Sequence, residues 1–150
     1  MIYLRKPEFH ILRVAAAALL VFSIGAHAES KYEESPLDPI YDLVEAGKYP
    51  EAVDKLEAIL NDDADDADAL SLMGYTYRKQ KQFDQALSYY QRALAIDPQH
   101  KATNEYLGQL YLETNQLAKA QERLAVLDEA CFFPCKEYTS LKYAIENYQQ

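Results

Sequence analysis

Two cysteines near the end of the chain, Cys131 and Cys135, are the residue types best suited to chemistry. A disulfide between them would close a five-residue loop, for which chain entropy gives about 2 kcal/mol of stabilisation. A redox pair usually has two intervening residues, and a structural zinc site needs four ligands. The spacing therefore favours a disulfide, with a thiol redox pair or a metal site as the alternatives.

Few other residues could support catalysis. His100 is the only histidine after residue 28, and a Ser-His-Asp or Cys-His arrangement would have to use it. His100 follows Asp97-Pro98-Gln99, a polar segment between two apolar stretches, which indicates a turn. Three glycines after residue 28 are too few for a glycine-rich phosphate loop. We therefore predict no catalytic residue, no cofactor and no small-molecule substrate.

The sharpest charge feature is the acidic run 62–68, in which five of seven residues are Asp. Calcium loops of the EF-hand type need Gly at the sixth position and Glu at the twelfth, and no register of this run gives both. Asp also caps helices and favours the positive end of the helix dipole. We expect the run to cap the next helix, with calcium binding as the alternative.

The first 28 residues have the pattern of a secretory signal peptide. Basic Arg5, Lys6 and Arg13 precede an apolar run over 14–25, and Ala26-His27-Ala28 provides a small-residue cleavage site. The apolar run is shorter than the roughly 20 residues of a membrane-spanning helix. We predict cleavage near Ala28 and a periplasmic or secreted protein, in whose compartment disulfides persist. An uncleaved signal anchored in the inner membrane is the alternative.

Charge narrows the class of partner. The whole chain has a formal net charge of −9, and removal of residues 1–28 takes away three basic residues and one acidic residue, which leaves −11. Such a surface repels the phosphates of nucleic acids. We therefore predict a protein or peptide partner and no nucleic acid.

A period of 34 residues runs through the remaining chain. Gly74 and Gly108 are one period apart. Three-membered series at the same spacing are Ala52/Ala86/Ala120, Tyr49/Phe83/Leu117 and Leu56/Tyr90/Leu124. Apolar residues recur every three or four positions over 70–77 and again over 83–93, which predicts two amphipathic helices joined by a short turn. Gly74 lets the second helix approach closely, with small Ala86 opposite it.

These residues resemble the tetratricopeptide repeat family. Residues 67–100 have the family pattern through Leu70, Met73-Gly74, Tyr77, Ala86, Tyr90, Ala93 and Pro98. Residues 101–134 have it through Leu107-Gly108, Tyr111 and Ala120, but Asn104 replaces a large apolar residue. Residues 33–66 have only the second half, through Ala52, Leu56 and Ile59. Before them, Pro39 predicts a short helix over 39–46, with Asp38 as its N-cap and Gly47 at its end.

The resemblance implies an all-α fold, a right-handed α-solenoid of about three antiparallel helix pairs. The repeat domain would span 38–134, with repeats over about 33–66, 67–100 and 101–134. Residues 29–37 would form a flexible N-terminus. Residues 135–150 would form a capping helix that covers the last apolar face of the solenoid, because its apolar residues share one helical face.

In this family the first helix of each pair lines a concave surface that takes a peptide or helix. By position, that groove would be lined by Tyr41, Glu45, Ser71, Tyr75, Arg78, Lys79, Glu105, Gln109, Leu112 and Glu113. Tyr41, Tyr75 and Gln109 share one repeat position, so they should form a row across the groove. One family variant clamps a C-terminal carboxylate with Lys and Asn, but here Leu37, Tyr41, Leu72, Ala102 and Tyr106 occupy those positions.

Three functions remain open from the sequence. The leading one is a non-catalytic adaptor or scaffold of the bacterial cell envelope that binds a protein in its groove. The second is an envelope thiol or metal-binding protein that uses Cys131 and Cys135. The third is a protein that assembles with itself through its imperfect first repeat, as a homo-oligomer.

Overall fold

The computed structural model describes residues 35–148, which form seven α-helices and no strand. The helices are α1 (Asp38–Glu45), α2 (Tyr49–Asp62), α3 (Ala67–Lys79), α4 (Phe83–Ile96), α5 (Lys101–Glu113), α6 (Leu117–Ala130) and α7 (Lys136–Glu146). The expected signal peptide over 1–28 and the adjoining residues 29–34 lie outside the described residues. None of these seven helices combines the length and the apolar character needed to cross a membrane.

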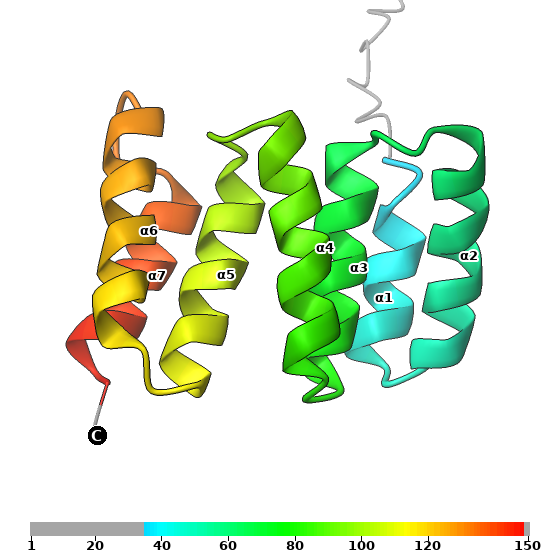
Figure 1. The fold of residues 1–150 in the computed structure, drawn as a ribbon, viewed down its shortest axis with the longest axis horizontal. Helices are drawn as coiled ribbons and strands as arrows, with labels where there is room; N and C mark the ends of the chain where they lie inside the picture. The colour runs from blue at the N-terminus through cyan, green and yellow to red at the C-terminus, as the bar shows by residue number, and fades with distance from the viewer. Residues whose placement is uncertain (1–34, 149–150) are drawn as a thin grey trace, which may run out of the picture. The chain divides into compact units, whose positions relative to one another are not determined.

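The helices form consecutive hairpins that stack in chain order (Figure 1). The pairs α1–α2, α3–α4 and α5–α6 pack within themselves, and α7 packs against both α5 and α6. Contacts between hairpins also join α1 to α3, α3 to α5, and α5 to α7. These four helices therefore form one continuous row of an α-solenoid, and α7 ends that row.

The three hairpin turns share one backbone device. Gly47, Lys81 and Asn115 lie 34 residues apart and all have positive φ, at 73°, 62° and 57°. At the first turn the amide of Lys48 donates to the Leu43 carbonyl at 2.8 Å, and the equivalent bonds recur at the other two turns. This is a Schellman ending, in which a left-handed residue lets the next amide reach back to the last helical turn. Non-glycine residues at two of the three positions kept this device out of our prediction.

The start of α1 differs slightly from the expectation. The helix begins at Asp38, so Leu37 holds the N-cap position and Pro39 is the second helical residue. The Asp38 carboxylate accepts the amide of Ser35 at 2.9 Å, outside the helix. Asp38 is therefore not the N-cap that the Asp-Pro pair predicted, because its side chain fixes the preceding turn.

The other two hairpins of the row begin with side-chain caps. The Asp66 carboxylate accepts the amide of Ala69 at 2.9 Å at the start of α3. At the start of α5, Nδ1 of His100 accepts the amide of Thr103 at 3.2 Å, while Nε2 lies 2.9 Å from Asp68. Asp66 and Asp68 thus organise helix starts in neighbouring hairpins.

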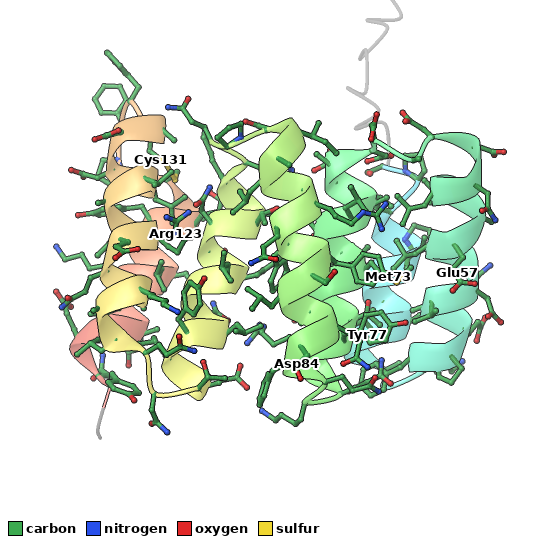
Figure 2. The ribbon with its side chains drawn as sticks, viewed as in Figure 1. Glu57, Met73, Tyr77, Asp84, Arg123 and Cys131 are labelled. Atoms are coloured by element: carbon green, nitrogen blue, oxygen red, sulfur yellow. A yellow bond between two sulfur atoms is a disulfide. The ribbon has the colours of Figure 1, made fainter. Side chains whose placement is uncertain are left out.

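Asn104 is buried although the family pattern favours an apolar residue there. Its amide group donates to the carbonyls of Pro98 and His100 at 3.1 and 3.0 Å. Its carbonyl accepts from Arg123 of α6 at 3.3 Å (Figure 2). A buried polar group is tolerated when its hydrogen bonds are satisfied, so Asn104 ties the α4–α5 turn to α6.

Candidate binding groove

Three tyrosines from successive helices of the row lie side by side. The ring centroids of Tyr41 and Tyr75 are 6.2 Å apart, and those of Tyr75 and Tyr106 are 4.6 Å apart. The hydroxyls of Tyr41 and Tyr106 approach to 3.4 Å. We call Tyr41, Tyr75 and Tyr106 the tyrosine row; such rings offer apolar area together with a polar group.

The predicted row had Gln109 where the structure has Tyr106. The amide of Gln109 instead donates to Glu105 at 2.9 Å, one turn back along α5. Counting by 34 residues aligns Tyr106 with Leu72, which is buried, so the period gave no sign that Tyr106 would reach the groove. The large ring of Tyr106 lies against Tyr75, a contact that the period does not specify.

Charged side chains surround Tyr75 in the middle of the row. Its hydroxyl donates to Glu45 at 2.5 Å, and Lys79 lies 3.4 Å from the same carboxylate. The Arg78 guanidinium and the Lys79 ammonium lie 5.3 and 5.6 Å from the ring centroid, within cation–π range. Burial and the bond to Glu45 raise the pKa of Tyr75, and the same bond lowers the pKa of Glu45. Tyr75 is therefore held as a neutral hydrogen-bond donor.

Arg78 was expected to give the groove a basic spot, but its charge is compensated. Its side chain is buried, with 8% of the residue exposed, and forms an ion pair with Glu113. Glu113 also accepts from Lys81 at 2.7 Å. Burial lowers the pKa of Arg78, but the proximity of Tyr90 and Glu113 outweighs it and raises the pKa overall. The guanidinium stays charged and paired inside the protein.

Two adjoining clefts open along the row. The first, of about 690 Å³, lies between α1, α5 and α7 and is lined by Asp38, Tyr41, Asp42, Ala102, Glu105, Tyr106, Lys136, Glu137 and Ser140. The second, of about 570 Å³, is lined by Arg78, Gln109, Leu112, Glu113, Ser140, Tyr143, Ala144, Asn147 and Tyr148. Ser140 of α7 borders both clefts, so they form one continuous groove, which we call the binding groove.

The structure distributes the predicted groove residues over this surface unevenly. Tyr41 and Glu105 line the first cleft, and Arg78, Gln109, Leu112 and Glu113 line the second. Glu45, Tyr75 and Lys79 form the charged cluster around the middle of the tyrosine row. Ser71 has only 1% of its surface exposed, so in this structure it offers a partner no contact.

Sequence reasoning missed the contribution of α7, which was expected only to cap the solenoid. Its residues Lys136, Glu137, Ser140 and Tyr143 line the two clefts. Extending the 34-residue period past residue 134 would have aligned Tyr143 with Gln109 and Tyr75. That alignment was the available signal that α7 continues the row of groove-lining helices.

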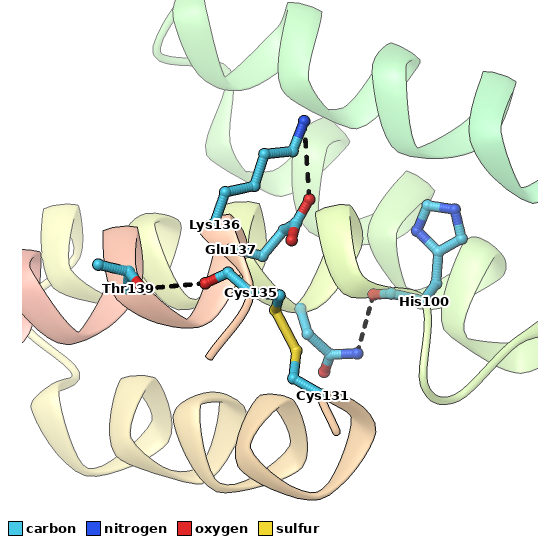
Figure 3. Close-up of a disulfide and its surroundings, with 7 residues drawn as sticks. His100, Cys131, Cys135, Lys136, Glu137 and Thr139 are labelled. Atoms are coloured by element: carbon cyan, nitrogen blue, oxygen red, sulfur yellow. Dashed lines mark hydrogen bonds and ion pairs between the residues drawn. A yellow bond between two sulfur atoms is a disulfide. The ribbon is translucent and has the colours of Figure 1, made fainter. Parts of the chain in front are cut away.

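Cys131 and Cys135 form a disulfide at the corner between α6 and α7 (Figure 3). The hydroxyl of Thr139 donates to the carbonyl of Cys135 at 3.0 Å, which holds the first turn of α7 to this corner. The loop exposes Phe132 and Phe133, by 95% and 75%. Within residues 35–148 there is no free cysteine and no cluster of three or more metal-binding side chains. The thiol and metal alternatives therefore lack their ligand or nucleophile in this oxidised form.

Sequence models support the repeat pattern. Residues 67–100 match one model described as a tetratricopeptide repeat, and residues 89–122 match a second model with the same description. The protein ycf37 of Guillardia theta, described as uncharacterized, is 36% identical over 63 residues. That match covers 42% of this chain and 35% of the relative.

Solved structures share the helical arrangement. The type III secretion translocator chaperone SycD of Yersinia enterocolitica matches with a TM-score of 0.61 and 20% identity, over 73% of this chain and 81% of that chain. A structure of SycD with a peptide of the translocator YopD matches with the same TM-score and 19% identity, over 73% of this chain and 83% of that one. At this level of identity the likeness concerns the fold.

Proposed function

Since this chain belongs to the tetratricopeptide repeat family through residues 67–122, we propose that its helical domain is a non-catalytic interaction module. It binds a peptide or a helix of a partner protein in the binding groove formed by α1, α3, α5 and α7. Proteins with such repeats present extended surfaces because each hairpin contacts only its neighbours in the stack. The domain would act as an adaptor or scaffold and not as an enzyme.

The observation that carries this proposal is the pair of clefts that meet at Ser140. One is lined by tyrosine rings and carboxylates, and the other by Leu112, Tyr143 and Ala144 around a paired Arg78. Binding sites for peptides combine apolar pockets with a few polar groups that fix orientation. The likeness to a chaperone solved with a bound peptide agrees with this use of the fold.

We place this activity in the bacterial cell envelope. The support is the signal-like sequence over 1–28 and the disulfide, since disulfides persist in oxidising compartments. Fractionation of cells, with N-terminal sequencing of the mature protein, tests the placement. A new N-terminus near Glu29 in the periplasm or medium supports it, while an intact N-terminus in the cytoplasm contradicts it.

The groove is tested by blocking it without disturbing the core. Ser140 is exposed and borders both clefts, so Ser140→Trp should place a bulky ring between them. Ser88 of α4 is exposed and lines neither cleft, so Ser88→Trp is the matched control. Wild type and both variants would be used to capture proteins from envelope extract.

The expected result is one partner retained by wild type and by Ser88→Trp, and depleted at least about tenfold by Ser140→Trp, given that central contacts dominate binding energy. Circular dichroism would verify that both variants keep their helices. Equal capture by all three proteins would show that the groove is not the interaction surface.

A further inference from the structure

The two clefts of the binding groove differ in charge, which bears on the chemistry of the partner. Four carboxylates line the first cleft, namely Asp38, Asp42, Glu105 and Glu137. Its single cation, Lys136, lies 3.8 Å from Glu137 and has a side chain that is 91% exposed (Figure 3). The first cleft therefore carries an excess of negative charge beside the rings of Tyr41 and Tyr106.

Resting on the proposed function, we propose that the first cleft recognises a basic side chain, Lys or Arg, of the partner segment, while the second cleft receives an apolar neighbour of that residue. Charge complementarity selects this occupant. The following contacts support it.

Glu105 is the central carboxylate of the first cleft. Its Oε1 accepts the hydroxyl of Ser140 at 2.6 Å and the amide of Gln109 at 2.9 Å. No basic side chain of the described residues forms an ion pair with it. Burial, reinforced by the nearby Glu137, raises the pKa of Glu105. Two neutral donors therefore orient this carboxylate, and a partner cation would supply the compensating charge that it lacks.

Tyr41 and Tyr106 add a second feature that suits a cation. Both rings line the cleft, and their hydroxyls are 3.4 Å apart. Burial raises the pKa of both phenols, so they remain neutral. Aromatic faces next to carboxylates attract guanidinium and ammonium groups through cation–π contact and charge together. Arginine is especially suited, because its planar group stacks on rings while it donates to carboxylates.

The second cleft offers no equivalent attraction to an anion. Its Arg78 is already paired with Glu113, which is bound by Lys81 as well. The remaining wall includes Leu112, Tyr143 and Ala144. An acidic segment or a terminal carboxylate would have to break the Arg78–Glu113 pair, whereas an apolar side chain would not. The groove therefore favours a basic residue with an apolar neighbour.

The test uses synthetic peptides as probes. Each is twelve residues long, capped at both ends, and has one Arg and one Leu in an Ala/Gln background, with the separation of Arg and Leu varied across the set. Matched peptides carry Gln or Glu in place of Arg. Binding to the mature protein is measured by fluorescence anisotropy, and the site by NMR shifts of backbone amides.

Two double variants with the same change of net charge separate the cleft from the general acidity of the protein. Asp42→Asn with Glu105→Gln removes charge from the first cleft. Glu122→Gln with Asp128→Asn removes the same charge from exposed positions of α6 that line neither cleft. Far-UV circular dichroism verifies that both keep their helices.

We expect at least one Arg peptide to bind wild type about tenfold more tightly than its Gln match, with shifts in α1, α5 and α7. The cleft variant should lose that preference, and the α6 variant should keep it. Equal binding of Arg, Gln and Glu peptides, no binding of any Arg peptide, or the same loss in both variants would overturn the proposal. If Ser140→Trp still abolishes capture of a partner in such a case, the proposed function survives and only the basic specificity fails.

Discussion

Gly74 and Gly108 occupy the same place in successive hairpins, yet they accept different side chains. A Cβ added to Gly74 would lie 2.6 Å from two ring carbons of Tyr90, which belongs to the same hairpin. One added to Gly108 would lie 2.5 Å from Leu141 of α7. Both glycines therefore admit a large, fully buried side chain onto a helix backbone, but the second receives it from the terminal helix.

The surroundings of the two junctions also differ. Arg78 lies beside Tyr90 at the first junction, and its equivalent one period later, Leu112, belongs to the apolar cluster that contains Leu141. A buried guanidinium needs a partner, and Glu113 supplies it. The first junction thus connects the core to charges in the binding groove, whereas the second closes the solenoid by apolar packing alone.

Truncation of the two covering side chains should give the largest effects. Tyr90→Ala is expected to lower the free energy of unfolding by about 3–5 kcal/mol, and Leu141→Ala by about 2–4 kcal/mol, because each leaves a cavity. Urea unfolding measures both. Hydrogen exchange should show that Leu141→Ala mainly increases opening of α7, which contacts only α5 and α6. A larger loss for Leu141→Ala would contradict the comparison.

Removal of the disulfide should loosen the second junction selectively. Cys131→Ser with Cys135→Ser is expected to cost about 2 kcal/mol, because the five-residue loop that leads into α7 is no longer closed. Phe132→Ser with Phe133→Ser alters the same loop at exposed positions and should change stability by less than about 0.5 kcal/mol. Equal losses in both double variants would mean that the loop residues, and not the covalent link, hold α7.

Charge at the first junction should appear as a dependence of stability on pH. Burial raises the pKa of Glu113, but the bonds from Lys81 and Arg78 outweigh it and hold the pKa below the ordinary glutamate value of 4.5. Glu113 therefore stabilises the fold fully above that value, and its contribution is lost as the pH falls through the lowered pKa. Glu113→Gln should cost about 1–3 kcal/mol at pH 7 and progressively less toward pH 3.

Urea unfolding of wild type and Glu113→Gln across that pH range measures the difference. Glu122→Gln on the exposed surface of α6 is the control, with an expected change below about 0.5 kcal/mol. A difference between wild type and Glu113→Gln that stays constant from pH 7 to pH 3 would remove the charge from the account of the first junction.

Alanine at each glycine gives the finest comparison. Replacing a helical glycine with alanine gains about 1 kcal/mol of helix propensity, and overpacking costs about 1–3 kcal/mol. At Gly74 the new Cβ meets a rigid buried ring and lies 3.2 Å from the Ala86 carbonyl, so we expect a net loss of about 1 kcal/mol. At Gly108 it meets only the flexible end of Leu141, so we expect a change near zero. Thermal unfolding of both variants measures this, and the reverse order would show that α7 is the more rigid neighbour.

Much of the fold could be predicted from local patterns. The 34-residue period and the apolar spacing predicted the helix pairs, and Gly47 predicted the end of α1. The row of first helices could also be predicted, but not its membership. Tyr106 and the α7 side chains were missed, and Ser71 is buried. Those differences arise because a one-dimensional period assigns a face of a helix without specifying how far a side chain reaches.

The sequence by itself determined the helices and their order, because periodicity, caps and turns act within a few residues of one another. It also determined the acidic character of the chain. Only the tertiary structure decided that Arg78 is neutralised by Glu113, that Leu141 covers Gly108, and that Ser140 joins two clefts. These contacts join residues about 32–35 positions apart, where packing of whole helices sets which side chains meet and which charges are left for a partner.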